Sequence, residues 1–123
     1  PRRIGWIDLV QLRQAVRENG LTDIALTKLD ILNGLKEIKA CTGYKVEDKV
    51  ITEMPASLTT FRKAKPIYKT IPCWDSLPEK VWEKGFKSLP DSLKKYIGFI
   101  EDEVNCDVSI VSVGPQRHET IIR

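Results

Sequence analysis

The stretch Asp8–Asp30 has the sequence DLVQLRQAVRENGLTDIALTKLD and decides the fold class, because it predicts a helix followed directly by a strand. We expect the helix over Asp8–Asn19, since Asp8 is a favourable N-cap and Gly20 can supply the left-handed residue that ends a helix. Its apolar face consists of Leu9, Leu12, Ala15 and Val16. Asp23–Thr27 then predicts a short, fully buried strand. A helix that leads into a buried strand is half of a parallel βαβ unit.

A second pair of the same kind lies near the end of the chain. Pro90–Val104 predicts a helix with Pro90 at its first helical position. Its apolar stripe consists of Leu93, Tyr96, Ile97, Ile100 and Val104. Val108–Val113 predicts another buried strand. Two helix–strand pairs predict an α/β fold, and parallel strands would end at the same rim of the sheet.

The segment between the two pairs is irregular. Glu37–Tyr44 predicts a strand with unequal faces, and a turn at Glu47-Asp48 pairs it with Val50–Met54 in a hairpin. Prolines exclude a helix of ordinary length between Met54 and Trp74, and Lys65–Trp74 predicts an extended edge segment. Three aromatic residues are expected to cover apolar surface rather than stack on a ligand: Trp74, Trp82 and Phe86.

The composition is that of a globular single domain. The chain has 123 residues, of which 41% are hydrophobic and 30% charged. No apolar run approaches the roughly 18 residues that span a bilayer, and no signal-peptide core stands at the amino terminus. Three scattered cysteines favour a reducing compartment. We therefore expect a cytoplasmic protein without a membrane partner, and a fragment of a longer one, since the chain begins with Pro1.

The charge balance gives little support to a nucleic-acid partner. Lys and Arg number 20 and Asp and Glu 17, for a net charge of +3. A weaker alternative is a mildly basic nucleic-acid binder with a patch of Arg2, Arg3, Arg13 and Arg17.

The tetrapeptide Thr27-Lys28-Leu29-Asp30 follows the first predicted strand. Open α/β sheets bind ligands outside the carboxyl ends of their strands. Asp30 there can accept two parallel hydrogen bonds, and guanine offers two adjacent donors, N1–H and the 2-amino group. Lys28 can lay its alkyl stem along the face of the base. This pattern favours GTP over ATP, although an ordinary strand exit with solvated charges has the same sequence.

The second predicted strand ends in Ser112-Val113-Gly114-Pro115. Gly114 lets the backbone approach a flat ligand closely, and Pro115 stiffens the turn. Backbone amides in this segment can bind the guanine carbonyl oxygen while Asp30 binds the opposite edge. A plain Gly-Pro turn is the alternative interpretation.

Several kinds of site are not indicated. No G-x-x-x-x-G-K-[ST] phosphate loop occurs, and no acidic cluster suggests a magnesium site. The single histidine, His118, is expected to be solvated rather than catalytic. Base recognition without phosphate chemistry implies that the reacting parts lie elsewhere.

Four blocks of the sequence occur together in one enzyme family: Arg2–Asp8, Leu26–Asp30, Gly34–Lys39 and Val111–Pro115. With these blocks the chain resembles adenylosuccinate synthetase over essentially its whole length, most loosely between Met54 and Pro90. The resemblance implies that residues 1–123 are the carboxyl-terminal, guanine-nucleotide-binding part of a single larger α/β domain. The implied fold is a P-loop-NTPase-like parallel sheet with an irregular β-hairpin and loop insertion.

The resemblance also assigns binding roles by position. The implied GTP-binding residues are Arg2, Lys28, Leu29, Asp30, Ser112, Val113, Gly114 and Pro115. Pro1 and Arg2 match the mobile loop that reaches the aspartate substrate, where the planar fork of Arg2 suits a carboxylate or phosphate. The family's phosphate loop, catalytic aspartate and catalytic histidine have no counterpart here. The chain is therefore expected to hold no catalytic residue and no metal ligand, and to be inactive alone.

The implied reaction joins IMP and L-aspartate to adenylosuccinate at the expense of GTP, in AMP biosynthesis. In the family, O6 of IMP attacks the γ-phosphate, and the amino group of L-aspartate then displaces the phosphoryl group. Mg²⁺ would be bound by parts outside this chain. The resemblance implies the substrates GTP, IMP and L-aspartate, a homodimer, and no nucleic-acid or membrane partner. The alternative is a stand-alone nucleotide-binding module that lacks catalysis.

Overall fold

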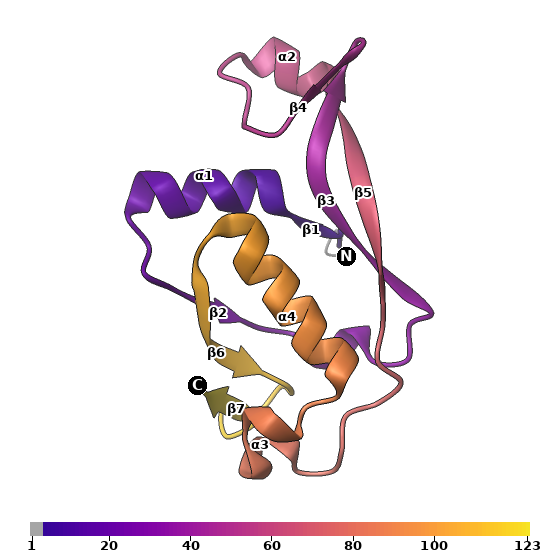
Figure 1. The fold of residues 1–123 in the computed structure, drawn as a ribbon, viewed down its shortest axis with the longest axis vertical. Coiled ribbons are helices and arrows are strands. Elements are labelled where there is room, and N and C mark those ends of the chain that lie inside the picture. The colour runs from indigo at the N-terminus through magenta and orange to yellow at the C-terminus, as the bar shows by residue number, and fades with distance from the viewer. Residues whose placement is uncertain (1–3) are drawn as a thin grey trace.

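The computed structural model describes residues 4–123, and two small β-sheets and two long helices form the framework of that part (Figure 1). In the first sheet, β1 (Ile7–Asp8) is parallel to β3 (Glu37–Val46). The strands β4 (Lys49–Ile51) and β5 (Lys65–Pro72) are both antiparallel to β3. The fold is α/β with parallel and antiparallel pairs, which confirms the predicted class.

The second sheet carries the two strands that the helix–strand pairs predicted. The strands β2 (Asp23–Leu26) and β6 (Asp107–Ser112) are neighbours and run parallel. A third strand, β7 (Thr120–Ile122), lies antiparallel to β6. Neither β7 nor the two-residue strand β1 was predicted, because such short strands depend on a partner strand rather than on their own sequence.

The two long helices confirm the sequence prediction. Helix α1 (Leu9–Asn19) begins after Asp8, whose carboxylate accepts hydrogen bonds from two backbone amides of the first turn, and ends at Gly20 with φ +60°. In α4 (Asp91–Val104) all five predicted stripe residues are buried. Pro90 is the N-cap of this helix and not its first helical residue.

The irregular middle contains only short helices. The helices α2 (Leu58–Lys63) and α3 (Val81–Lys84) are accompanied by the 3-10 turns η1 (Leu29–Leu32) and η2 (Phe86–Ser88). The β3–β4 hairpin turns at the predicted position, but β4 ends three residues earlier than the predicted Met54. The segment Lys65–Pro72 is an extended strand along one edge of β3, as predicted.

Most buried side chains form one core between the sheets and the helices. Trp74 lies in it and contacts the ring of Tyr96 at 5.8 Å between ring centroids, while Trp82 and Phe86 pack against its margin. The prediction that these three aromatic residues cover apolar surface is confirmed. A smaller cluster of Val10, Cys41 and Tyr44 lies where α1 meets β3.

Both predicted strands are buried on one face only, so the expectation that they are fully buried was wrong. Leu26, Val111 and Ile121 occupy one row across the sheet and belong to the core or pack against it. The next row consists of Ala25, Ile110 and Ile122, which we call the bare sheet face. Ile110 is 37% exposed and Ile122 80% exposed, because α1 and α4 are on the other side of the sheet.

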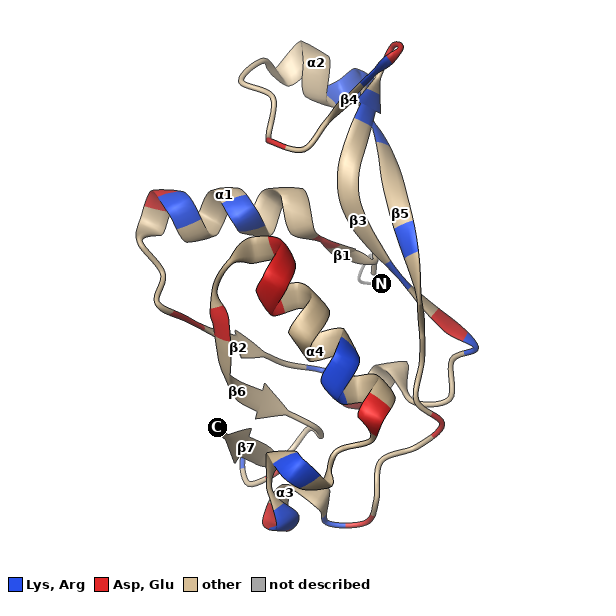
Figure 2. Ribbon diagram, viewed as in Figure 1, with Lys and Arg blue, Asp and Glu red and all other residues tan. Residues whose placement is uncertain are grey.

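The basic residues of the described part are spread over several elements rather than gathered on one of them (Figure 2). Arg13 forms an ion pair with Glu103, and Arg17 forms one with Glu53. The weak expectation of a basic patch is therefore wrong for Arg13 and Arg17, while Arg2 and Arg3 lie outside the described residues. Over residues 4–123, no helix has the length and apolar character needed to cross a membrane.

Candidate functional site

The first predicted binding segment follows β2 and forms a tight turn. Thr27 and Lys28 are exposed, and Lys28 has φ +61° and ψ +33° at the start of η1. A lysine in this left-handed region is strained by roughly 1–2 kcal/mol, and such residues cluster at functional sites. Glu47, Lys80 and Asn105 share this conformation, so the turn is a candidate site because of its place at the end of β2 rather than because of the strain alone.

Leu29 fixes the turn to the core. Its side chain is 1% exposed and belongs to the main apolar cluster. The residues on either side of it are accessible, since Lys28 is exposed and Asp30 half-buried.

The carboxylate of Asp30 is available for a ligand. The backbone carbonyl of Asp30 accepts a hydrogen bond from the Asn33 amide at 3.2 Å. No group within residues 4–123 is placed to donate a hydrogen bond to its side chain. A half-buried carboxylate without an internal donor is suited to accept hydrogen bonds from a bound molecule.

The second predicted segment follows β6 and lies in the hairpin between β6 and β7. Val113 is 5% exposed and anchors the segment in the core, as Leu29 does for the first one. The Val113 amide donates to the Glu119 carbonyl at 2.9 Å, which closes a loop of residues 114–118. The hydroxyl of Ser112 donates to the carbonyl of Gly114 at 3.2 Å. The loop is thus organised by its own hydrogen bonds.

The parallel pairing of β2 and β6 brings the two segments together. Leu26 pairs with Val111, so the residues that follow each strand leave the sheet at the same rim. The turn η1 also contacts β6 directly. The sequence prediction of a shared rim is confirmed, but the roles of the individual residues are not tested by this geometry. Pro1 and Arg2 lie outside the described residues.

Lys28 borders a hollow of about 180 Å³. Trp6, Ile31 and Tyr96 form part of its wall, and neither Asp30 nor Ser112–Pro115 lines it. Beside it lies a wider apolar hollow of about 610 Å³. Its exposed apolar side chains are Ile4, Trp6, Ile31, Leu35 and Tyr68, which we call the Trp6 patch.

The remaining reactive side chains form no second site. His118 is exposed, and its ring lies 5.5 Å from the Trp82 ring in an edge-on contact. Burial raises the pKa of the Cys41, Cys73 and Cys106 thiols, which disfavours the nucleophilic thiolate. Among residues 4–123, no group of three or more His, Cys, Asp or Glu side chains is placed to hold a metal ion.

Glu119 is a further residue of the β6–β7 loop that was not predicted. Its side chain and backbone make most of the hydrogen bonds that close the β6–β7 loop. No local pattern distinguished this glutamate from the other acidic residues, because its role depends on the hairpin that β7 completes.

Comparison with known proteins agrees with the family resemblance. The family model for adenylosuccinate synthetase matches residues 1–121. The adenylosuccinate synthetase of Caldanaerobacter subterraneus is 49% identical over 122 residues, which are 99% of this chain and 28% of that protein. The enzyme of Clostridioides difficile is 46% identical over 123 residues, which are 100% of this chain and 28% of that protein.

The fold agrees with a solved structure as well. A fully ligated adenylosuccinate synthetase from Plasmodium falciparum matches with a TM-score of 0.89 and 30% identity. That match covers 100% of this chain and 30% of the solved chain. The chain therefore spans about 28% of the length of the curated relatives that it matches.

Proposed function

The chain belongs to the adenylosuccinate synthetase family, and we propose that it recognises the guanine base of GTP within the complete enzyme. The complete enzyme would join IMP and L-aspartate to adenylosuccinate in AMP biosynthesis. The observation that carries this proposal is the parallel pairing of β2 with β6, which leads Thr27–Asp30 and Ser112–Pro115 to one rim of the sheet.

Asp30 would read one edge of the base. Its carboxylate has no donor within residues 4–123 and can accept from both N1–H and the 2-amino group of guanine. Adenine offers no such pair of donors. A site that pairs with a polar edge rejects other bases strongly, because its own groups would be left buried and unpaired.

Gly114 would read the neighbouring 6-oxo group of the base. In the run Val113–Gln116, the amides of Val113 and Gln116 are already bonded to Glu119, and Pro115 has no N–H. Gly114 therefore carries the one amide of this run that has no partner among residues 4–123. That N–H is suited to donate to O6 of guanine, while the exposed stem of Lys28 would cover the face of the ring.

The reacting parts of the enzyme would lie outside this chain. The sequence contains no glycine-rich phosphate loop. We assign phosphoryl transfer, IMP binding and Mg²⁺, which neutralises phosphate charge in such reactions, to the rest of the enzyme. Arg2 would reach the aspartate substrate and the GTP phosphates. On this proposal, the chain supplies guanine recognition within the complete enzyme and would not catalyse the reaction by itself, and the homodimer of the family remains a prediction.

Two uncovered apolar surfaces support the proposal that residues 1–123 are part of a larger domain. Parallel strands are usually covered on both faces of their sheet, yet residues 4–123 leave the bare sheet face of Ala25, Ile110 and Ile122 exposed. In the Trp6 patch, Ile4 is 85% exposed and Ile31 is 56% exposed. Contiguous exposed apolar surface of this kind marks an interface. We propose that the remaining portion of the synthetase packs on both surfaces.

Replacement of Asp30 by Asn in the complete enzyme tests the proposal. The Asn amide presents one donor and one acceptor, which suits xanthine rather than guanine. We expect kcat/KM for GTP to fall at least about 100-fold, because one hydrogen bond is lost and an unfavourable donor–donor contact with the 2-amino group replaces it, and use of XTP to rise. Asp48→Asn, in the exposed turn between β3 and β4, is the matched control. An Asp30→Asn enzyme that still preferred GTP to XTP would show that Asp30 does not read the base.

A further inference from the structure

Glu119 is joined to the β6–β7 loop by three hydrogen bonds. Its carboxylate oxygen Oε2 accepts from the Gln116 amide at 2.7 Å. Its backbone carbonyl accepts from the Val113 amide at 2.9 Å, and its own amide donates to the Gln116 carbonyl at 3.1 Å. The two backbone contacts belong to the hairpin, whereas the carboxylate contact depends on the side chain.

The Glu119 carboxylate also fills the space beside Gly114. A Cβ atom on Gly114 would lie 2.2 Å from Oε2 and 2.4 Å from Cδ of Glu119. The absence of a side chain at Gly114 therefore leaves the room in which this carboxylate packs. Gly114 and Glu119 act as a pair that sets the path of the loop.

We propose that Glu119 is a positioning residue for guanine recognition, holding the Gly114 N–H toward the 6-oxo group of the base. This inference rests on the proposed function of Asp30 and Gly114. Glu119 accepts hydrogen bonds from the amides of Val113 and Gln116. Within Val113–Gln116, only the amide of Gly114 is therefore left to donate. Its side chain does not itself contact the base.

The chemistry of the base allows this role to be separated from that of Asp30. 6-Thio-GTP retains N1–H and the 2-amino group but replaces the oxygen at C6 with sulfur, a weaker acceptor. ITP retains the 6-oxo group and N1–H but lacks the 2-amino group. Preference for GTP over 6-thio-GTP therefore reports on the Gly114 edge, and preference for GTP over ITP reports on the Asp30 edge.

The test measures steady-state kinetics of the complete synthetase with GTP, 6-thio-GTP and ITP for Glu119→Ala and Glu119→Gln. We expect Glu119→Ala to raise KM for GTP about 10-fold, the value of one hydrogen bond, with kcat and the KM for IMP nearly unchanged. The ratio of its kcat/KM for GTP to that for 6-thio-GTP should fall toward unity, while the ratio for GTP and ITP should stay unchanged. Glu119→Gln keeps an acceptor for the Gln116 amide and should remain within about 3-fold of the parent enzyme. Glu79→Ala, an exposed glutamate before α3, is the matched control.

Two results would overturn the inference. The first is an unchanged KM for GTP in Glu119→Ala; the second is an equal loss of both preferences, which a merely structural role predicts. If Glu119→Ala does not fold, Glu119→Asp withdraws the carboxylate by one methylene. Its preferences for GTP over 6-thio-GTP and for GTP over ITP are then measured instead. Asp30→Asn is assayed in parallel. If Asp30→Asn changes the preference for GTP over ITP while Glu119→Ala changes neither preference, the inference fails and the proposed function stands. If Asp30→Asn also leaves both preferences unchanged, the proposed function fails.

Discussion

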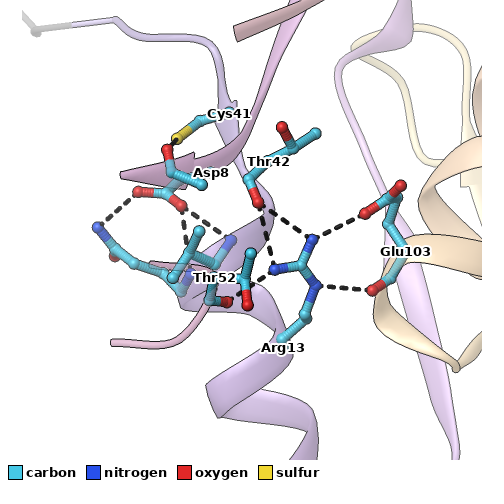
Figure 3. A network of polar contacts seen from close by, with 9 residues as sticks. Asp8, Arg13, Cys41, Thr42, Thr52 and Glu103 are labelled. Atoms are coloured by element: carbon cyan, nitrogen blue, oxygen red, sulfur yellow. Dashed lines mark hydrogen bonds and ion pairs between the residues drawn. The ribbon is translucent and has the colours of Figure 1, made fainter. Parts of the chain in front are cut away.

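Arg13 is the residue whose replacement should test the packing of this fold most directly (Figure 3). From α1, its guanidinium donates to the backbone carbonyl of Glu103 at 2.8 Å and to the Glu103 carboxylate at 2.7 Å. It also donates to the Thr52 carbonyl at 2.8 Å and makes longer contacts of 3.3 and 3.4 Å with the Thr42 carbonyl. One side chain thus joins α1 to the end of α4, to β3 and to the segment after β4.

The contacts of Arg13 allow the loss in its Met variant to be estimated. Three of them, at 2.7–2.8 Å, are short hydrogen bonds, each worth roughly 1 kcal/mol net. Met keeps most of the apolar stem in place, and its ordering cost is similar to that of Arg, so side-chain entropy nearly cancels in this comparison. The side chain of Arg13 is only 19% exposed, so water replaces these bonds poorly. We therefore expect Arg13→Met to lower the free energy of unfolding by about 3 kcal/mol.

Urea unfolding followed by tryptophan fluorescence, to which the buried Trp74 contributes, would measure this loss, with the thermal midpoint as a second reading. For a chain of this length, the midpoint should fall by about 10 °C. Arg13→Lys should lower the free energy of unfolding by about 2 kcal/mol, since an ammonium group cannot reproduce the planar fork of donors. Glu103→Gln keeps the backbone acceptor and should lose at most about 1 kcal/mol. A loss below about 1 kcal/mol for Arg13→Met, or equal losses for all three variants, would show that the Arg13 contacts do not stabilise the fold in this way.

Two further predictions concern other parts of the chain. Burial raises the pKa of Tyr96 to about 12, compared with 10 for a solvated tyrosine. As the pH rises, the unfolded chain therefore releases this proton before the folded chain does. The protonated phenol contributes fully to the free energy of unfolding below pH 10. Roughly 2–3 kcal/mol of that free energy is lost between pH 10 and 12. Tyr96→Phe should reduce this alkaline decline in urea unfolding, and an identical decline in parent and variant would contradict the assignment. Lys28→Gly should relieve the left-handed strain at φ +61°, leaving stability equal or up to about 1 kcal/mol higher, while KM for GTP rises. Lys80→Gly, at φ +53° before α3, should change stability in the same way and leave KM for GTP unchanged. An equal rise in KM for GTP in the Lys80→Gly enzyme would count against a role for Lys28.

Local sequence determined the elements whose signals are contained within one segment. Asp8 and Gly20 delimit α1, because capping and left-handed backbone are properties of single residues. The apolar stripe of α4 follows from helical periodicity, and all of it is buried. The two segments Thr27–Asp30 and Ser112–Pro115 were identified as strand ends, and the structure places them at one rim. The family, too, was evident from the order of the sequence blocks.

Only the tertiary structure decided the features that require two distant segments. Apolar residues in β2 and β6 predicted burial on both faces, but α1 and α4 cover one, so Ile110 and Ile122 are exposed. The short strand β7 exists because β6 supplies its partner, and the Glu119 carbonyl accepts from the Val113 amide only once that hairpin closes. Arg13 finds its acceptors 29 to 90 residues away along the chain. The physical reason is that periodicity and capping are short-range, whereas the pairing of a strand edge or a charge is set by whichever partner the folded chain brings within a few ångströms.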